Sequence, residues 1–215
     1  MRFIEFRKKY NVPEEIIELI KDKKIRAINK AHRSGDYVYD INNEYILKIS
    51  LDKDKLLREK IVNDELRDKL PLSKSILFIE KENIYYYLKT KVIGTPLVNY
   101  INKPQLVIKL LKEAFDIIHN VDISNIKILK ILNKDSIGNK LVHGDFCLPN
   151  ILIHKNKVSG FIDVEAMGLG DPWIDYSWCI WSFEYNLNTK EYTKELLTEL
   201  NIEFNQELYN KYIEI

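Results

Sequence analysis

The chain has 215 residues, 46% of them hydrophobic, which is enough to bury the core of one compact unit or of two small lobes. Its 33 Lys and Arg residues nearly balance 32 Asp and Glu residues, so the net charge of +1 argues against a nucleic-acid or anionic-membrane partner. Two cysteines, Cys147 and Cys179, are too few for a disulfide framework and lack metal-binding spacing. The N-terminus lacks the apolar segment of a signal peptide, and no run of about eighteen apolar residues occurs. We therefore expect a cytoplasmic protein.

Four segments in the first half have the aromatic and β-branched composition of strands, and turn-forming residues join them in pairs. They are Tyr37–Ile41, Tyr45–Ile49, Ile76–Glu80 and Ile84–Thr90. The sequence therefore predicts two hairpins of an antiparallel sheet. The stretch after Thr90 contains Gly94 and Pro96 and indicates a connector. We place a lobe boundary there, between residues 1–91 and residues 92–215.

Helical spacing of apolar residues accounts for most of the rest of the chain. The predicted helices cover residues 14–21, 52–70, 104–120, 172–185 and 190–215. Glu59 falls on the apolar stripe of the second of these helices. Short strands at Ile151–His154 and Val158–Ile162 interrupt the helical second half. The pattern predicts an α+β fold with a sheet-rich first lobe and a mostly helical second lobe.

The densest functional pattern is VHGDFCLPN at residues 142–150, followed by GFID at residues 160–163. Asn150 follows Asp145 by five positions, as in the catalytic loop of protein kinases, and Asp163 ends an apolar strand. Magnesium prefers oxygen ligands, so Asn150 and Asp163 are candidate metal ligands. Asp145 is the candidate that accepts or orients the proton of an incoming hydroxyl group. An isolated His-Gly-Asp would fit a surface turn equally well, but the ordered series favours phosphoryl transfer.

Lys48 lies on the same face of a predicted strand as Ile46, where a charge needs a partner. Glu59 on the following helix is the expected partner. In kinases a strand lysine pairs with a helix glutamate and with the α and β phosphates of the nucleotide. A lysine with its stem over apolar surface and a solvated glutamate would explain both residues without a nucleotide.

With these motifs in place, the sequence resembles the aminoglycoside phosphotransferases, above all the 3′-phosphotransferase branch. The resemblance rests on His143-Gly144-Asp145, on Asn150 and on KVSGFID at residues 157–163, and it extends to residues 173–175 and 58–71. It implies a protein-kinase-like two-lobe fold with an N-terminal antiparallel sheet plus helix and a mostly helical C-terminal lobe. The nucleotide is then expected in the N-terminal lobe, and the catalytic and acceptor-binding groups in the C-terminal lobe.

The same resemblance implies transfer of the γ-phosphate of ATP, with GTP as an alternative donor, to a hydroxyl group of an aminoglycoside antibiotic, and hence antibiotic resistance. Asp145 would be catalytic, Asn150 and Asp163 would bind Mg²⁺, and Lys48 with Glu59 would hold the phosphates. The further expected nucleotide contacts are Ser34, Thr90, Val92, Leu152 and Ile162. The residues expected to support the catalytic loop are His143 and Asp175. A short polar turn would explain Ser34 equally well.

The acceptor is less well defined, because the segment before His143 is shorter than in the family and Glu165 stands where the family usually has glycine. A polycationic acceptor needs carboxylates, and each candidate also fits a solvated surface acid. The candidates are Glu165, Glu184, Glu214 and the terminal carboxylate of Ile215. Outside the motif, the other histidines fit surface or packed positions, and Cys147 lacks an activating base and should be inert.

Two other functions stay open. A kinase of a small metabolite such as choline, a sugar or a methylthioribose-like compound would use the same chemistry, because a fold does not fix a substrate. A nucleotide-binding module with little catalysis would also fit the short segment and Glu165. A protein kinase is disfavoured, because no Ala-Pro-Glu segment follows Asp163. We expect a monomer or a dimer.

Overall fold

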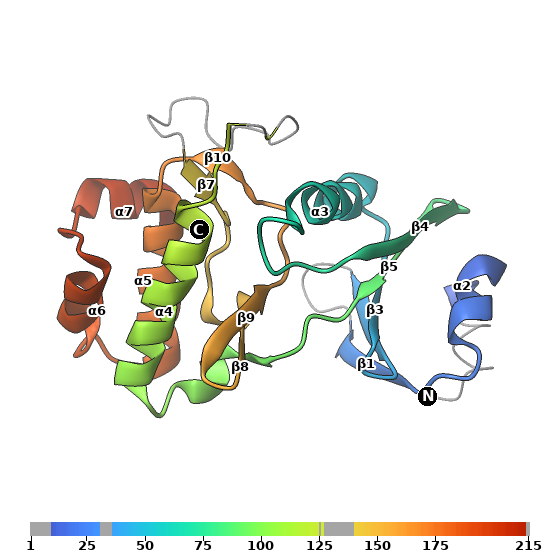
Figure 1. Ribbon diagram of the computed structural model, residues 1–215, viewed down its shortest axis with the longest axis horizontal. Helices are drawn as coiled ribbons and strands as arrows, with labels where there is room; N and C mark the ends of the chain where they lie inside the picture. The colour runs from blue at the N-terminus through green and yellow to red at the C-terminus, as the bar shows by residue number, and fades with distance from the viewer. Residues whose placement is uncertain (1–9, 31–35, 125, 127–139, 214–215) are drawn as a thin grey trace. The chain divides into compact units, whose positions relative to one another are not determined.

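The computed structural model describes residues 10–30, 36–124, 126 and 140–213, and Figure 1 shows their helices and strands. These residues form two compact units. The first contains the described residues up to Asp64 together with Ser73–Lys91. The second contains Glu65–Leu72 and the described residues from Val92 onward. Residues 65–72, which the sequence analysis assigned to the N-terminal lobe, thus belong to the second unit.

A five-stranded antiparallel sheet forms the first unit, in the order β1-β2-β3-β5-β4. Its strands are β1 Ile25–Lys30, β2 Tyr37–Ile41, β3 Tyr45–Ser50, β4 Ser75–Lys81 and β5 Ile84–Thr90. Both predicted hairpins are confirmed, and β1 is an additional edge strand that pairs with β2. In the first turn Asn42 and Asn43 have φ of 55° and 61°, a left-handed conformation that asparagine tolerates better than most residues.

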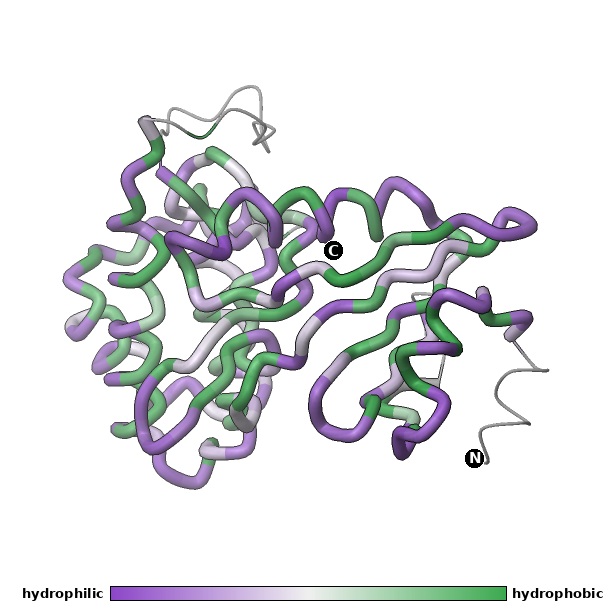
Figure 2. Tube along the Cα trace, turned by 45° about the vertical axis from the view of Figure 1, so that its right-hand side comes forward, coloured by the Kyte–Doolittle hydropathy of each residue, from purple (hydrophilic) through white to green (hydrophobic). Residues whose placement is uncertain are grey.

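The two faces of this sheet carry different side chains. Buried apolar residues at alternating positions of β2, β3 and β5 share a core with α2, which spans Glu14–Ile20. The other face carries Lys48 and Tyr87, which bond to Glu59 and Asn63 of α3, Lys53–Leu66. Hydrophobic and hydrophilic stretches alternate along the chain in Figure 2.

The stripe predicted on α3 is confirmed. Its apolar members within the helix, Leu56, Val62 and Leu66, are buried together with Glu59. The helix ends at Leu66, earlier than predicted, and a turn follows it in which the backbone N–H groups of Lys69 and Leu70 both donate to the carbonyl oxygen of Leu66.

Helices dominate the second unit. They are α4 Pro104–His119, α5 Trp173–Leu187, α6 Thr193–Leu200 and α7 Gln206–Ile213. Two small sheets accompany them, in the orders β6-β8-β9 and β10-β7. Their strands are β6 Thr95–Pro96, β7 Lys140–Val142, β8 Ile151–His154, β9 Lys157–Phe161 and β10 Gly168–Gly170. None of the helices in the described ranges is both long enough and apolar enough to cross a membrane.

The single helix predicted over residues 190–215 is wrong, because two helices occupy this region. Asn201, with φ of 54°, ends α6 in a left-handed conformation, and α7 begins at Gln206. Asparagine is one of the few residues that adopts this conformation at a helix end, so the break has a local cause. The apolar periodicity on both sides of Asn201 concealed it.

Candidate active site

The loop between β7 and β8 carries three of the predicted site residues, His143, Asp145 and Asn150. The amide nitrogen Nδ2 of Asn150 donates to the carboxylate oxygen Oδ2 of Asp145 at 2.9 Å and to the backbone oxygen of Asp145 at 3.0 Å. Asn150 is 7% exposed and ends a short 3₁₀ turn, Leu148–Asn150, whereas Asp145 is partly exposed. The amide therefore orients the carboxylate, and the amide oxygen of Asn150 is the atom left to serve as a metal ligand.

Asp175 of α5 holds the beginning of this loop. Its carboxylate is fully buried and accepts the backbone N–H groups of His143 at 2.8 Å and Gly144 at 2.9 Å. His119, at the end of α4, lies with Nε2 3.2 Å from the same carboxylate. Hydrogen bonds to a charged acceptor are stronger than neutral ones, about 1.5–3 kcal/mol each. The sequence predicts that Asp175 supports the loop, whereas His119 fits a packed or surface position in the sequence.

His143 links Asp145 to the strand before Asp163. The backbone N–H of Asp145 donates to Nδ1 of His143 at 3.3 Å, so Nδ1 is the acceptor and the ring proton is on Nε2. Nε2 then donates to the carbonyl oxygen of Ile162 at 3.1 Å. The imidazole is fully buried. It thus fixes the backbone of Asp145 relative to the residue that precedes Asp163.

Gly144 has a φ of +83°, a conformation that favours glycine. A Cβ atom at this position would lie 2.6 Å from the carbonyl oxygen of Ala166 and 2.9 Å from its Cβ. The close approach and the backbone conformation therefore both require glycine, where the kinase pattern has arginine.

Asp163 and Glu165 place two carboxylates together after β9. Their carboxylate oxygens lie within 4.8 Å of each other. The backbone N–H of Ile162 donates to the carbonyl oxygen of Asn150 at 3.0 Å, which ties this segment to the end of the catalytic loop. Asp163 has a φ of 55°, uncommon outside glycine but tolerated by aspartate. Two carboxylates and an amide oxygen are the hard donors that Mg²⁺ prefers, so the residues present fit this ion.

In the first unit, the predicted pairing of Lys48 with Glu59 is confirmed. Nζ of Lys48 lies 2.7 Å from Oε2 of Glu59, and the two side chains are 7% and 1% exposed. Such burial excludes the alternative of a solvated glutamate beside a surface lysine. A second lysine, Lys89 of β5, contacts the other oxygen of Glu59, Oε1. The sequence analysis did not foresee this contact.

The sheet face around Lys48 also carries apolar side chains that the sequence analysis did not assign. Val38 pairs with Lys48 across β2 and β3, and Ile46 pairs with Lys89 across β3 and β5. Both are partly exposed. Counting by twos from Lys48 already places Ile46 on this face, but Val38 could not be placed without the strand register.

The other predicted nucleotide contacts are distributed over both units. The backbone N–H of Thr90 donates to the carbonyl oxygen of Lys74 at 2.8 Å, so Thr90 would have to meet a base through its carbonyl oxygen. Val92 is partly exposed at the beginning of the connector. Leu152 of β8 is 6% exposed, and Ile162 follows β9 and is partly exposed. Ser34 lies outside the described residues.

Of the predicted acceptor-binding acids, Glu165 lies beside Asp163, as described above. Glu184 of α5 accepts a hydrogen bond from the hydroxyl group of Thr193 at 2.7 Å, and Nζ of Lys190 is 3.7 Å from its other oxygen. These contacts give Glu184 a structural role at the beginning of α6. Glu214 and Ile215 lie outside the described residues.

Cys147 lies inside the catalytic loop without a reactive thiol. Burial, reinforced by the neighbouring Asp145, raises the pKa of the Cys147 thiol. The group is therefore protonated at neutral pH, as the inert cysteine of the sequence analysis should be.

Comparisons with known proteins find similar sequences. Residues 137–203, which contain the loop and Asp163, match the model of the phosphotransferase enzyme family. A probable aminoglycoside 3′-phosphotransferase of Lactococcus lactis is 28% identical over 169 residues, 73% of this chain and 60% of that protein. An aminoglycoside 3′-phosphotransferase of Niallia circulans is 28% identical over 239 residues, which cover 88% of this chain and 90% of that protein. The chain thus spans about 60% of the length of the Lactococcus relative.

Solved structures show the same fold. A type VIII aminoglycoside 3′-phosphotransferase superposes with a TM-score of 0.76 at 14% identity, covering 93% of this chain and 94% of that one. An aminoglycoside phosphotransferase from Streptomyces rimosus gives 0.73 at 14% identity, with 99% and 97% covered. The fold is that of a protein-kinase-like phosphotransferase, as expected. The chain is thus similar to aminoglycoside phosphotransferases in fold and, over the segments given above, in sequence.

Proposed function

We propose that this protein transfers the γ-phosphate of ATP to a hydroxyl group of an aminoglycoside in the presence of Mg²⁺. The observation that carries the proposal is the catalytic loop, in which Asn150 orients Asp145 while His143 connects that backbone to the segment of Asp163. Relatives named as 3′-phosphotransferases support the acceptor class. So do structural neighbours solved with ADP and hygromycin B or with ATP and streptomycin.

In this proposal Asp145 receives the hydroxyl proton of the acceptor as the oxygen attacks the γ-phosphorus and the bond to ADP breaks. General-base assistance of this kind contributes about 10²- to 10⁴-fold. Bound Mg²⁺ would neutralise charge on the phosphates, and the amide oxygen of Asn150 with the carboxylate of Asp163 would hold it. Glu165 lies close enough to Asp163 to share the same ion.

On the nucleotide side, Lys48 is the group we assign to the α and β phosphates, with Glu59 as its partner. The base would meet the carbonyl oxygen of Thr90 and the backbone of Val92. Apolar contacts with the base are proposed for Leu152 and Ile162, and by position for Val38 and Ile46. GTP would fit the same phosphate contacts, and the protein would act in the cytoplasm, where the nucleotide is found.

The test is release of ADP in the presence of ATP, Mg²⁺ and kanamycin-, neomycin- or streptomycin-type acceptors. Native protein should show acceptor-dependent turnover, and Asp145→Asn should reduce it by at least about 100-fold, because the amide cannot accept the proton. Asp116→Asn is a matched control. It removes an exposed carboxylate of α4 that pairs only with Lys112 among the described contacts, and should leave turnover unchanged.

The outcomes separate the competing functions. Turnover with choline or a sugar and none with any aminoglycoside would keep the chemistry and replace the acceptor. Nucleotide binding without acceptor-stimulated ADP release would leave a binding module and overturn the proposal. Turnover retained in Asp145→Asn would contradict the role of Asp145.

A further inference from the structure

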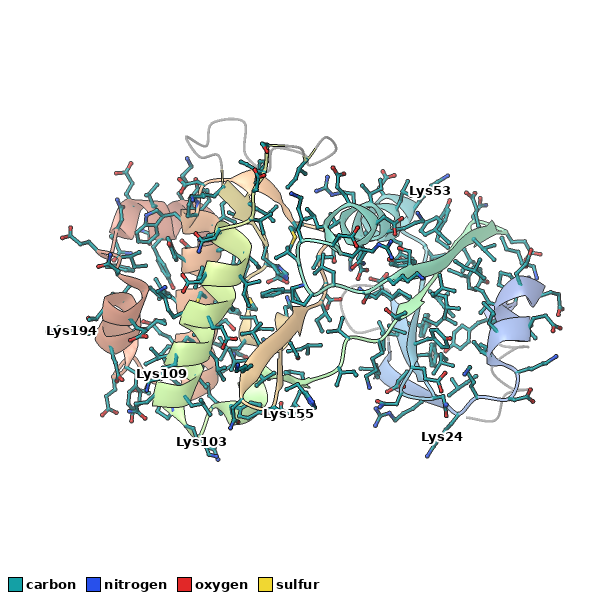
Figure 3. The ribbon with its side chains drawn as sticks, in the orientation of Figure 1. Lys24, Lys53, Lys103, Lys109, Lys155 and Lys194 are labelled. Atoms are coloured by element: carbon teal, nitrogen blue, oxygen red, sulfur yellow. The ribbon has the colours of Figure 1, made fainter. Side chains whose placement is uncertain are left out.

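The buried ion cluster of the first unit contains one cation more than the kinase pattern requires. Lys48 lies 2.7 Å from Oε2 of Glu59, and Lys89 contacts Oε1 of the same carboxylate. The two lysines are 5% and 3% exposed, and Glu59 is 1% exposed. Ordinary lysines of this chain are different, since the six labelled in Figure 3 all point outward from the fold and are exposed. Glu59 therefore holds two buried ammonium groups, one on each oxygen.

The strand register explains why Lys89 reaches this position. Lys89 pairs with Ile46 across β5 and β3, and Lys48 pairs with Tyr87. Directly paired residues, and residues two apart on a strand, share a face of the sheet, so both lysines point toward α3. Lys89 immediately precedes Thr90, where the strand approaches the connector.

Neighbouring side chains hold Lys89 in place. Its Nζ lies 5.7 Å from the centroid of the Tyr87 ring, within the range of a cation–π contact. The Tyr87 hydroxyl in turn bonds to Nδ2 of Asn63 at 3.1 Å and to Oγ of Ser75 at 2.8 Å. Asn63 lies one helical turn after Glu59. The same face of α3 therefore contacts Lys89 through Glu59 and Tyr87 through Asn63.

We propose that Lys89 is a positioning residue that keeps Glu59 in place while Lys48 pairs with the phosphates of the bound nucleotide; this rests on the proposed function. Glu59 has two oxygens and needs a cation on at least one of them, because an unpaired buried carboxylate is strongly unfavourable. When Lys48 contacts a phosphate, Lys89 supplies that cation.

The proposal separates the phosphates from the base, so the experiment compares ATP with adenosine. Dissociation constants for both, with Mg²⁺ present, are measured for native protein and for Lys89→Met. We expect Lys89→Met to weaken ATP binding about tenfold, the usual effect of losing a charge-assisted hydrogen bond, and to leave adenosine binding within about twofold. Lys91→Met is the matched control, because Lys91 pairs with Asp40 and not with Glu59, and it should bind both ligands as native protein does.

A second arm tests whether Lys89 acts through Glu59. In a Glu59→Gln background, Lys89→Met should change ATP binding by less than about twofold, because the group it positions is no longer charged. Lys89→Gln keeps a hydrogen-bond donor for Glu59 and replaces Lys89→Met if the latter does not fold, as monitored by circular dichroism. It should weaken ATP binding severalfold, again without a change for adenosine.

Each result decides something. Equal weakening of ATP and adenosine binding, or unchanged ATP binding in the folded variants, would overturn the role of Lys89 while leaving the proposed function intact. A full tenfold effect in the Glu59→Gln background would also overturn it, because Lys89 would then act on the nucleotide directly. If native protein binds no ATP, the proposed function itself fails.

Discussion

At the scale of single residues, Asp175 is the strongest determinant of the catalytic loop, because its buried carboxylate accepts two consecutive backbone N–H groups. In Asp175→Asn, the amide group would place an N–H₂ opposite one of these donors. We expect the free energy of unfolding to fall by about 1–3 kcal/mol, the range for a buried donor left unsatisfied. Urea denaturation measures this decrease in the free energy of unfolding. Glu80→Gln, an exposed carboxylate paired with Lys53 on the first unit, should change stability by less than about 1 kcal/mol, and a similar loss in both variants would contradict the assignment.

Gly144 supports a second prediction at this scale. Gly144→Ala would bring a Cβ to within 2.6 Å of the carbonyl oxygen of Ala166 in a left-handed backbone conformation. Strain of this kind typically amounts to about 1–3 kcal/mol, and relieving it would move the backbone of Asp145. We expect acceptor-dependent kcat to fall much more than ATP affinity, because Lys48, the residue proposed to contact the phosphates, lies in the other unit. A variant with native kcat would show that the loop tolerates the displacement.

The sequence predicted the residues of the site whose spacing is local. Asp145, Asn150 and Asp163 fall within nineteen positions, and the kinase pattern alone relates them. His119 and Lys89 could not be found in this way. His119 meets Asp175 over a separation of 56 positions, and Lys89 meets Glu59 over 30. In the sequence, Lys89 is only a polar residue near the end of a strand, and its burial depends on the pairing of β5 with β3.

At the scale of elements, the local sequence predicts which helices and strands form better than it predicts the residues at which they begin and end. The turns of both β2–β3 and β8–β9 contain asparagine in the left-handed region, at Asn43 and Asn156, and the sequence predicts the strands on both sides of each turn. The strand β1 was not, since IRAINK has few strand-forming residues and becomes a strand through pairing with β2. Secondary structure of this kind depends on its neighbour and carries little local signal.

Asp40 of β2 connects these sheet elements and gives a pH-dependent prediction. Its side chain is 4% exposed and accepts from Arg26 of β1 and from Lys91 after β5, each at 2.8 Å. Burial is the largest influence and acts to raise the pKa of Asp40, but the bonds from Lys91, Arg26 and the backbone of Asn43 together outweigh it and lower the pKa. A lowered pKa contributes stability above the unfolded value, about 3.9, which is lost as pH falls through the folded value.

We therefore expect Asp40→Asn to be less stable than native protein at pH 7, with a difference that shrinks as the pH is lowered below about 4. Urea denaturation at a series of pH values measures this difference. Asp64→Asn removes an exposed carboxylate that pairs with Lys60 one helical turn away and should show a small difference throughout. A gap for Asp40→Asn that stays constant down to pH 3 would mean that packing, and not charge, accounts for the loss.

At the scale of the whole molecule, the residues proposed to contact the ligand are divided between the two units. Lys48 belongs to the first unit, and Asp163 belongs to the second. Length and composition allowed either one compact unit or two lobes, and the connector after Thr90 was the signal for two. The sequence does not predict that residues 65–72 belong to the second unit, because they continue directly from α3, most of which belongs to the first unit.

Lys48 and Asp163 are both proposed to act on MgATP, so stabilisation of the folded state by this ligand tests the two assignments together. At a concentration of 100 times its dissociation constant, a ligand that binds only the folded state adds about 2.7 kcal/mol. For a chain of this size, each kcal/mol corresponds to about 2–4 °C, so MgATP should raise the midpoint of thermal unfolding by about 5–10 °C. At the same ATP concentration, Lys48→Met should reduce the increase with or without Mg²⁺, because it removes a phosphate contact. Asp163→Asn should reduce only the part that depends on Mg²⁺, because it removes a metal ligand. Loss of the whole increase in Asp163→Asn, even without Mg²⁺, would place this residue on the nucleotide itself and contradict its assignment as a metal ligand.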